Sequence, residues 1–295
     1  MIAMSTATAV VVGVDGSPDS LNAVEWAAAD ARRRRRPLRI VHAYLWPMVY
    51  APMAVPLPVD YGQTMREAAE EVVNEAVAKA RAVAPDVDIS TDMPVQQAAA
   101  ALVDASRDAD VTVVGHRGLG GFTGLLVGSV GIELAAHAAS PVVVVRHADR
   151  PAGPEAGRIV VGVDGSHDAD RALRFAFEQA SFCGVGLTAV HAYLYPEQTE
   201  PGELLPLVYD QDDLRDEERR ALAESITGWA GKYPDVDVRR AVVRGRSAAV
   251  LNDLSAGAEL LVVGSRGRGG FTGLLLGSVS QAVIHHAACP VAVVR

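Results

Sequence analysis

Apolar and polar residues follow two alternating patterns along the first half of the chain. Short runs rich in β-branched residues, such as residues 9–14, are typical of parallel strands buried on both faces. Between these runs, apolar residues recur at helical spacing, as at Leu21, Val24, Ala27 and Ala28. The pattern predicts five strands joined by helices, and right-handed crossovers then give an open, doubly wound parallel sheet of the α/β class.

The bounds of these elements follow from the same pattern. Strands are expected over residues 9–14, 38–44, 87–93, 110–115 and 141–146. Helices are expected after Ser17, over 64–83, over 96–107 and from about Ser129. Ser17 is a suitable N-cap residue, and Pro18 suits the first helical position because proline lacks the N–H that is unpaired there.

The second half repeats the first half element for element. The stretch GHRGLGGFTGLLVGSV begins at Gly115, and a stretch that begins at Gly264 agrees with it at 13 of 16 positions. The two starting glycines are 149 positions apart. We therefore expect two domains, residues 1–147 and 158–295, joined by a linker rich in Pro, Gly and Ala at 148–157.

Composition and charge narrow the classes of function. With 49% hydrophobic and 21% charged residues the chain has a globular composition, and no apolar run reaches the roughly 18 residues that span a bilayer. The start lacks the basic region of a signal peptide, so we expect a cytoplasmic protein. A net charge of −9 argues against nucleic acid as the main partner. The arginine run at 32–36 follows an amphipathic stretch, where it is expected to sit at a helix C-terminus.

The sequence says less about the roles of the two cysteines and of the two Pro-rich segments. Cys183 and Cys289 have no metal-ligand spacing, which predicts reduced and mostly buried thiols. Residues 46–63 and 195–212 are Pro-rich and longer than usual between a strand and a helix. Either these are surface loops packed by their own apolar residues, or they form a lid or a subunit contact near the strand C-termini.

The repeated glycine loop has the parts of a phosphate cradle. It follows the fourth strand, and ligands of open parallel sheets bind beyond the strand carboxyl ends where the strand order reverses. Gly115 and Gly118 are expected to adopt positive φ and to approach a ligand closely, so that backbone N–H groups form an anion-binding nest. Gly128 and Ser129 open the next helix, whose N-terminus offers free N–H donors and a positive dipole end.

An aspartate follows the first strand of each half, at Asp15 and Asp164. Its carboxylate could accept hydrogen bonds from ribose hydroxyls or hold a phosphate-bound Mg²⁺ ion. The alternative is an Asx-turn or a helix-cap acceptor. The glycine spacing matches neither a Walker A loop nor the Rossmann fingerprint, which belongs after the first strand.

These residues together resemble the universal stress protein family. The spacing G-x2-G-x9-G-S is similar to the ATP-binding motif of that family, VVGVDGS opens both halves, and His42–Ala43 and His191–Ala192 end both second strands. The resemblance covers nearly the whole chain and is greatest to tandem universal stress proteins of mycobacteria and related actinobacteria. It implies two Rossmann-like (adenine nucleotide α-hydrolase-like) domains with five-stranded sheets of order 3-2-1-4-5, often dimeric through the last strand.

The resemblance also implies one ATP site in each half. The motif glycines and serine would hold the phosphates, the aspartate would face the ribose or metal side, and the backbone at Ala43 and Ala192 would contact adenine. The expected contacts in the first half are Gly13, Asp15, Ala43, Gly115, His116, Arg117, Gly118, Leu119, Gly120, Gly121, Gly128, Ser129 and Val130. Those in the second half are Gly162, Asp164, Ala192, Gly264, Ser265, Arg266, Gly267, Arg268, Gly269, Gly270, Gly277, Ser278 and Val279. Mg²⁺ would bind through the ATP phosphates, with Asp15 and Asp164 as candidate ligands.

The two copies of the loop differ at positions that could change the ligand contacts. His116 corresponds to Ser265, and Leu119 corresponds to Arg268. Arg268 could add a phosphate contact in the second half alone, so the two sites are expected to differ in affinity.

No residue stands out as a catalyst, since phosphoryl transfer needs a positioned nucleophile and strong charge compensation. His42 and His191 are the best candidates for a base, but we expect them to satisfy backbone groups. His285 and His286 are adjacent on a helix and diverge, which disfavours a shared metal site. The first hypothesis is a non-enzymatic ATP-dependent regulator of stress response, dormancy or growth, with an unidentified protein partner and a homodimeric state. The alternatives are a slow ATPase or phosphotransferase, and an interaction scaffold with structural ATP.

Overall fold

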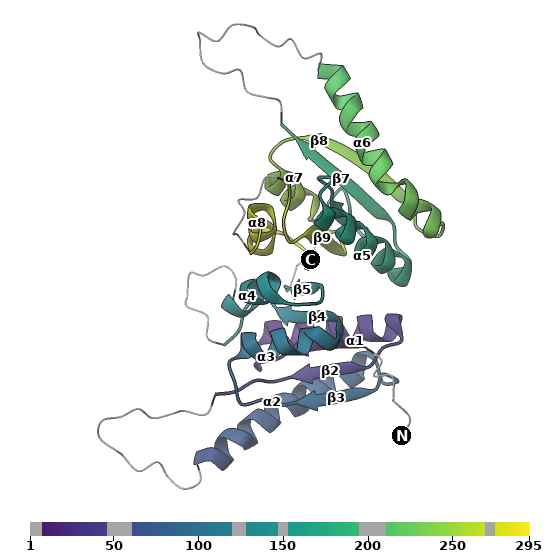
Figure 1. Ribbon diagram of the computed structural model, residues 1–295. Coiled ribbons are helices and arrows are strands. Elements are labelled where there is room, and N and C mark those ends of the chain that lie inside the picture. The colour runs from purple at the N-terminus through teal and green to yellow at the C-terminus, as the bar shows by residue number, and fades with distance from the viewer. Residues whose placement is uncertain (1–7, 46–60, 120–127, 147–152, 195–210, 269–274) are drawn as a thin grey trace, which may run out of the picture. The chain divides into compact units, whose positions relative to one another are not determined.

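The computed structural model describes residues 8–45, 61–119, 128–146, 153–194, 211–268 and 275–295. The chain divides into two compact units, Met1–His147 and Ala148–Arg295 (Figure 1). Each unit is an α/β structure with its own sheet and its own core, and the two are described separately below.

The first unit alternates strands and helices along the chain. Its strands are β1 (Ala9–Gly13), β2 (Leu38–Val41), β3 (Ile89–Asp92), β4 (Ala109–Gly115) and β5 (Val142–Val145). Its helices are α1 (Pro18–Arg34), α2 (Tyr61–Val83), α3 (Ala98–Ala105), the short 3₁₀ helix η1 (Ser106–Asp108) and α4 (Ser129–His137).

The second unit has the same order of elements. Its strands are β6 (Ile159–Gly162), β7 (Leu187–Tyr193), β8 (Val238–Arg244), β9 (Leu260–Gly264) and β10 (Val291–Val294). Its helices are α5 (His167–Cys183), α6 (Gln211–Lys232), α7 (Ser247–Leu254) and α8 (Ser278–His286). None of the helices that the structure describes is long and apolar enough to cross a bilayer.

Each unit contains a parallel sheet with a reversal of strand order next to its first strand. The first sheet runs β3-β2-β1-β4-β5 and the second runs β8-β7-β6-β9-β10, with parallel pairing throughout. Helix α1 packs on α2 and α3 packs on α4, as α5 does on α6 and α7 on α8. Because the crossovers run in opposite directions on the two sides of the first strand, helices cover both faces of each sheet (Figure 1). The predicted Rossmann-like fold class is confirmed.

Buried β-branched residues form the centre of each sheet. Val10, Val12, Val111 and Val113 are fully buried in β1 and β4, and Val12 pairs with Val113 in the ladder. Such strands are apolar on both faces because helices cover both. This is why continuous valine runs, rather than alternating ones, predicted the sheet.

Local capping explains where helix α1 begins and ends. Ser17 is the N-cap, and its side chain accepts a hydrogen bond from the Ser20 amide, with proline at the first helical position as predicted. The helix ends at Arg34 and is capped by Arg35, which adopts the left-handed conformation with φ of 55°. The arginine run therefore lies at a helix C-terminus as expected, and Arg36 pairs there with Asp110 at 2.7 Å.

Most predicted bounds differ from the structure by one to three residues, and those of the second strand and the third helix show where the pattern misled. The second strand ends at Val41 rather than at residue 44, and Tyr44 forms only an isolated bridge with Val95. The helix expected to reach residue 107 ends at Ala105 and tightens into η1. Ser106 causes this tightening locally, because its hydroxyl donates to the Val103 carbonyl at 2.7 Å.

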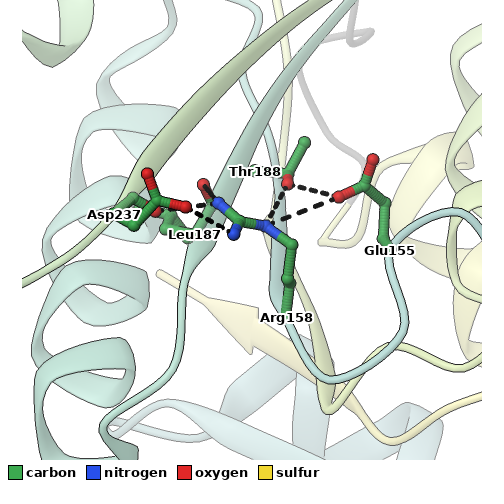
Figure 2. A network of polar contacts seen from close by, with 5 residues as sticks. All are labelled: Glu155, Arg158, Leu187, Thr188 and Asp237. Carbon is green, nitrogen blue, oxygen red and sulfur yellow. Dashed lines mark hydrogen bonds and ion pairs between the residues drawn. The ribbon is translucent and has the colours of Figure 1, made fainter.

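A polar network fastens the start of the second unit to its sheet (Figure 2). The buried guanidinium of Arg158 donates to Thr188 Oγ1 at 3.1 Å, to the Leu187 carbonyl at 2.8 Å and to Asp237 Oδ2 at 2.7 Å. Thr188 in turn donates to Glu155 Oε2 at 2.5 Å. Glu155 lies in the segment expected to be a linker, so this part of the segment is held against the second unit.

Candidate functional site

In each unit, the loops after the first and fourth strands meet at one edge of the sheet. Strands β1 and β4 are neighbours, so both loops leave the sheet at their shared carboxyl end. The Leu119 amide donates to Asp15 Oδ2 at 2.8 Å, and the Ser17 hydroxyl donates to the Arg117 carbonyl at 3.2 Å. In the second unit the Arg268 amide donates to Asp164 Oδ2 at 3.0 Å. The expected meeting of the two loops is thus present twice.

Asp15 forms the Asx-turn that was the alternative to a ligand role. Its Oδ1 accepts from the Ser17 amide at 3.0 Å while Oδ2 accepts from Leu119. A carboxylate offers about four acceptor positions, so these bonds leave capacity for a ligand on the half-buried side chain. The turn therefore orients the carboxylate without using it up.

The hydrogen bonds around Asp15 also favour its charged form. Burial raises the pKa of this carboxyl, but the hydrogen bonds from Ser17, Leu119 and Ser20 together lower the pKa by more than burial raises it. The net result is a pKa below the ordinary aspartate value of 3.8, so the group is ionised at neutral pH.

Gly115 and Gly118 are required for space rather than for backbone conformation. The expectation of positive φ at Gly115 and Gly118 is wrong: neither glycine is among the described residues with positive φ. A Cβ on Gly115 would lie 2.7 Å from the backbone of Asp19, because the end of β4 packs against the start of α1. A Cβ on Gly118 would overlap the Asp15 carboxylate.

Positive φ occurs instead in the aspartate turns. Gly16 has φ of 83° and Gly165 has φ of 72°. These glycines follow Asp15 and Asp164, and the left-handed conformation lets the chain turn sharply from the strand into the helix. The close contacts of Gly115 and Gly118 recur in the second unit at Gly264 and Gly267, where a Cβ would meet Asp168 and Asp164 respectively.

The N-termini of α4 and α8 border the same loops. Gly128 is the N-cap of α4 and donates to the His116 carbonyl at 2.9 Å, and Gly277 donates likewise to Ser265 at 2.8 Å. Neither N-cap provides a side chain that caps the helix. Ser129 and Val130, and Ser278 and Val279, are the first helical residues. The first-turn amides and the positive end of the dipole therefore lie beside the glycine loop.

Gly13 and Gly162 lie away from this cluster. A Cβ on Gly13 would come within 2.6 Å of the Leu102 side chain on α3, and one on Gly162 within 2.9 Å of Leu251 on α7. Their small size lets a helix approach the sheet, which is a packing role.

The strand-end histidines contact backbone carbonyls, as expected. His42 Nδ1 lies 2.8 Å from the Val14 carbonyl, and His191 Nδ1 lies 2.7 Å from that of Val163. His191 Nε2 also lies 2.9 Å from Glu218 Oε2 on α6. Ala43 and Ala192 follow these histidines, so their backbone borders the turns that hold Asp15 and Asp164.

An aspartate on the first helical turn, which is not among the expected site residues, joins each loop to its helix. Asp19 Oδ2 accepts from the Arg117 amide at 3.1 Å. Its counterpart Asp168 accepts from the Ser265 hydroxyl at 2.9 Å and from the Arg266 amide at 3.2 Å. The signal was present, because the two aspartates occupy the same position in the two repeats.

The two sites differ in side chains that surround a similar backbone. His116 is buried, and its Nε2 lies 2.6 Å from a guanidinium nitrogen of Arg146. Ser265, at the corresponding position, is fully buried against Asp168. Leu119 is 71% exposed, whereas Arg268 donates from its side chain to the Gly165 carbonyl at 3.1 Å.

Several expected site residues lie outside the described residues. These are Gly120, Gly121, Gly269 and Gly270. Most of the two Pro-rich segments, residues 46–60 and 195–210, also lies outside them.

Within the described part of the chain there is no group of three His, Cys, Asp or Glu side chains that could hold a metal ion. The rings of His285 and His286 are 6.1 Å apart between centroids and tilted by 46°. Neither cysteine forms a disulfide, and Cys289 is buried whereas Cys183 is partly exposed.

Comparison with known proteins gives matches over the full length. The model of the universal stress protein family matches residues 7–146 and 155–295. A universal stress protein of Mycolicibacterium smegmatis is 37% identical over 303 residues, covering 100% of this chain and 99% of that protein. One of Mycobacterium tuberculosis strain H37Rv is 40% identical over 296 residues, covering 97% and 96%. In structure, the chain is similar to a universal stress protein from Archaeoglobus fulgidus DSM 4304, with a TM-score of 0.69, 24% identity and 98% coverage of both chains.

Proposed function

This chain belongs to the universal stress protein family, and we propose that it binds one ATP molecule in each unit as a nucleotide-dependent regulator. The observation that carries the proposal is the contact between the aspartate turn and the glycine loop. It occurs as Asp15 with Leu119 and again as Asp164 with Arg268. This contact joins two loops at the point where the strand order reverses, which is where open parallel sheets bind ligands. Its recurrence in both units supports a ligand site.

The described residues offer suitable groups for each part of a nucleotide. The amides at the start of α4, beside Gly118 and Gly128, suit phosphate oxygens because they combine donors with the positive dipole end. The ionised Asp15 carboxylate suits ribose hydroxyls, which are donors. The backbone of Ala43 would then face the adenine edge, as the family resemblance implies.

Magnesium fits these sites only as an ion carried by the nucleotide. Mg²⁺ usually keeps several waters and binds through one or two carboxylates together with substrate phosphates. Asp15 and Asp164 each provide one carboxylate, and the described residues contain no larger ligand cluster. When bound, the ion would neutralise phosphate charge, and the aspartate would orient it.

The contacts of the two histidines favour a site that binds ATP over a site that hydrolyses it. His42 and His191 direct Nδ1 to backbone carbonyls, and His191 directs Nε2 to Glu218. Both ring nitrogens of His191 are therefore engaged by protein groups, which disfavours this histidine as a general base. ATP occupancy would act by favouring one shape or partner surface, since a ligand shifts an equilibrium only through differential affinity.

The first experiment counts the nucleotide in freshly purified, desalted protein after denaturation. About two ATP molecules per chain are expected. Mainly ADP would favour a slow ATPase or phosphotransferase instead. If nothing is released, Mg-ATP is added in a melting assay, where a concentration 100 times Kd gives about 2.7 kcal/mol of stabilisation. Absence of any shift would refute the proposal and leave the interaction scaffold.

The residue assignment is tested with Asp15→Ala and Asp164→Ala, singly and together. Each single variant should lose one ATP per chain, and the double variant should lose both. A double variant with normal nucleotide content would show that the aspartate turns do not form the site.

The regulatory role and the homodimer are tested in solution. Light scattering of the full chain with and without Mg-ATP should give the mass of a dimer. A protein partner captured with the wild type should be released when the double variant, which cannot bind ATP, replaces it. Equal capture by both would favour a scaffold whose ATP is structural.

A further inference from the structure

The two sites share their backbone contacts but carry different side chains at one equivalent position. Leu119 and Arg268 occupy equivalent places, and their amides make the same contact with the aspartate at 2.8 Å and 3.0 Å. Because the backbone is fixed in the same way, the side chains project from equivalent points in the two units. Any difference in ligand preference can therefore be traced to the side chains.

The side chain of Arg268 folds over the aspartate turn of its own unit. One guanidinium nitrogen donates to the Gly165 carbonyl at 3.1 Å, and a Cβ on Gly165 would overlap the guanidinium. Arg268 is an exposed residue. The contact holds the cation beside the site while using only one of its five N–H donors.

The guanidinium of Arg268 forms no ion pair with a carboxylate of the residues that the structure describes. By contrast, Arg266 two positions earlier has Asp168 at 3.6 Å. Gly277 at the start of α8 lies close to this segment, since a Cβ there would be 3.4 Å from the Arg266 Cα. The loop segment that carries this cation thus borders the helix N-terminus proposed to hold phosphate.

The first site has an apolar side chain at the same place. Leu119 is 71% exposed and offers neither charge nor hydrogen-bond donors. Its unit therefore has one positive charge fewer at the loop. The attraction of an added cation grows with the negative charge of the ligand, so the difference matters most for polyphosphates.

We propose that Arg268 is a specificity-determining residue that makes the second site select nucleotides by their number of phosphates, whereas the first site does so weakly. The inference rests on the proposed ATP binding and adds which nucleotides each site retains. A guanidinium can form paired hydrogen bonds with phosphate oxygens, which makes it suited to this role. The chain would then hold ATP in the second unit under conditions in which the first unit exchanges ATP for ADP or AMP.

The test is a reciprocal exchange of the two side chains in the full-length protein. Asp15→Ala isolates the second site and Asp164→Ala isolates the first. Calorimetry in each background gives Kd for Mg-ATP, ADP and AMP. The ratio of the AMP Kd to the ATP Kd should be about tenfold larger in the second site, the usual size of one charged hydrogen bond. Arg268→Leu should remove that excess, and Leu119→Arg should create it in the first site.

Two controls separate charge from structure. Arg268→Lys should retain part of the preference, because it keeps the charge but loses the planar fork. Raising the salt concentration should reduce the preference in the second site, since the distance over which exposed charges interact falls from about 8 Å at physiological ionic strength to about 3 Å in 1 M salt. Both loops are exposed at this position, so the melting temperature of the exchange variants should match the parent chain.

Three results would overturn the proposal. Equal ratios in the two sites would do so, as would an Arg268→Leu variant that weakens ATP, ADP and AMP by the same factor. The second result would mean that the contact with Gly165 only shapes the turn. Failure of both sites to bind any nucleotide would overturn the proposed function itself, and with it this inference, whereas tight binding with equal ratios overturns the inference alone.

Discussion

The Leu119 amide lies 2.8 Å from Asp15 Oδ2, although 104 positions separate the two residues in the chain. This bond closes the loop after β4 onto the turn after β1. Gly118 sits directly beneath it, so close that a side chain there would overlap the carboxylate. The loop, the turn and the intervening glycine are therefore packed so closely that a single added methyl group would disturb their contacts.

Replacement of Gly118 by alanine should weaken ATP binding in the first unit by about tenfold, which is the effect of losing one charged hydrogen bond. The added methyl group forces the Asp15 carboxylate to rotate away from Leu119. Calorimetry at ATP concentrations near Kd should then show one high-affinity site per chain instead of two. Gly267→Ala should do the same in the second unit, where the methyl group would meet Asp164.

The matched control is Gly228→Ala on the exposed side of α6, where a Cβ would meet nothing within 4 Å. That variant should keep both ATP sites and gain about 0.5–1 kcal/mol of stability, because alanine restricts the unfolded chain and favours helix. Unchanged ATP affinity in a folded Gly118→Ala protein would contradict the role assigned to the Asp15–Leu119 contact.

Asp15 should stabilise the fold at neutral pH and lose this contribution in acid. The pKa of its carboxyl is lowered in the folded protein relative to the ordinary value of 3.8. For a lowered pKa the contribution is complete above the unfolded value and is lost as the pH falls through the folded value. Urea unfolding of wild type and Asp15→Asn should thus give a constant difference in the free energy of unfolding between about pH 5 and 7. The difference should shrink as the pH falls below about 4, and a difference that grew in acid would contradict the hydrogen-bond assignment.

The sheet of each unit was predictable because its centre is buried on both faces. Valine runs such as Val10–Val12 have no polar alternation, and the repeat provides each element twice. The bound at Ala105 was not predictable from periodicity, because it depends on the hydroxyl of one residue, Ser106, bonding back to the preceding turn. Helix propensity is a property of a whole segment, whereas the end of α3 depends on one hydrogen bond.

The site was predictable as a meeting of two loops but not in its detail. Sequence alone cannot distinguish a glycine needed for positive φ from one needed for space. At Gly115 the deciding neighbour is the backbone of Asp19, which lies in a distant part of the chain. The repeat of Asp19 at Asp168 marks the position but not its role, since the partner amide belongs to Arg117 across the sheet edge. Contacts of this kind follow from tertiary packing and not from local pattern.

The two cysteines should react at very different rates in the native protein. Cys289 is completely buried ahead of β10, whereas Cys183 is partly exposed at the end of α5. Maleimide labelling followed by peptide mass spectrometry should therefore modify Cys183 first, and Cys289 only when the second unit opens. Labelling in urea provides the reference in which both react. Rapid native modification of Cys289 would contradict its burial.

This difference makes Cys289 a reporter for the network around Arg158. In a Cys183→Ser background, Arg158→Met keeps most of the side-chain volume but removes the hydrogen bonds that the guanidinium donates to Leu187, Thr188 and Asp237. The buried Leu187 carbonyl loses a charged donor, at a cost of about 2 kcal/mol. Because labelling of a buried thiol follows the population of the open form, the rate at Cys289 should rise about 30-fold.

The control for this last experiment is Asp237→Asn, which leaves the contacts of Arg158 with Thr188 and Leu187 in place. The Asp237 side chain is 73% exposed, so solvent already screens its ion pair, and surface pairs of this kind contribute little. The Cys289 rate should then stay close to that of the parent protein. Equal acceleration by both variants would mean that the exposed ion pair, rather than the buried carbonyl contact, holds residues 155–158 against the sheet. Acceleration by Arg158→Met alone would locate the stabilisation at the buried end of the guanidinium, where the second unit begins.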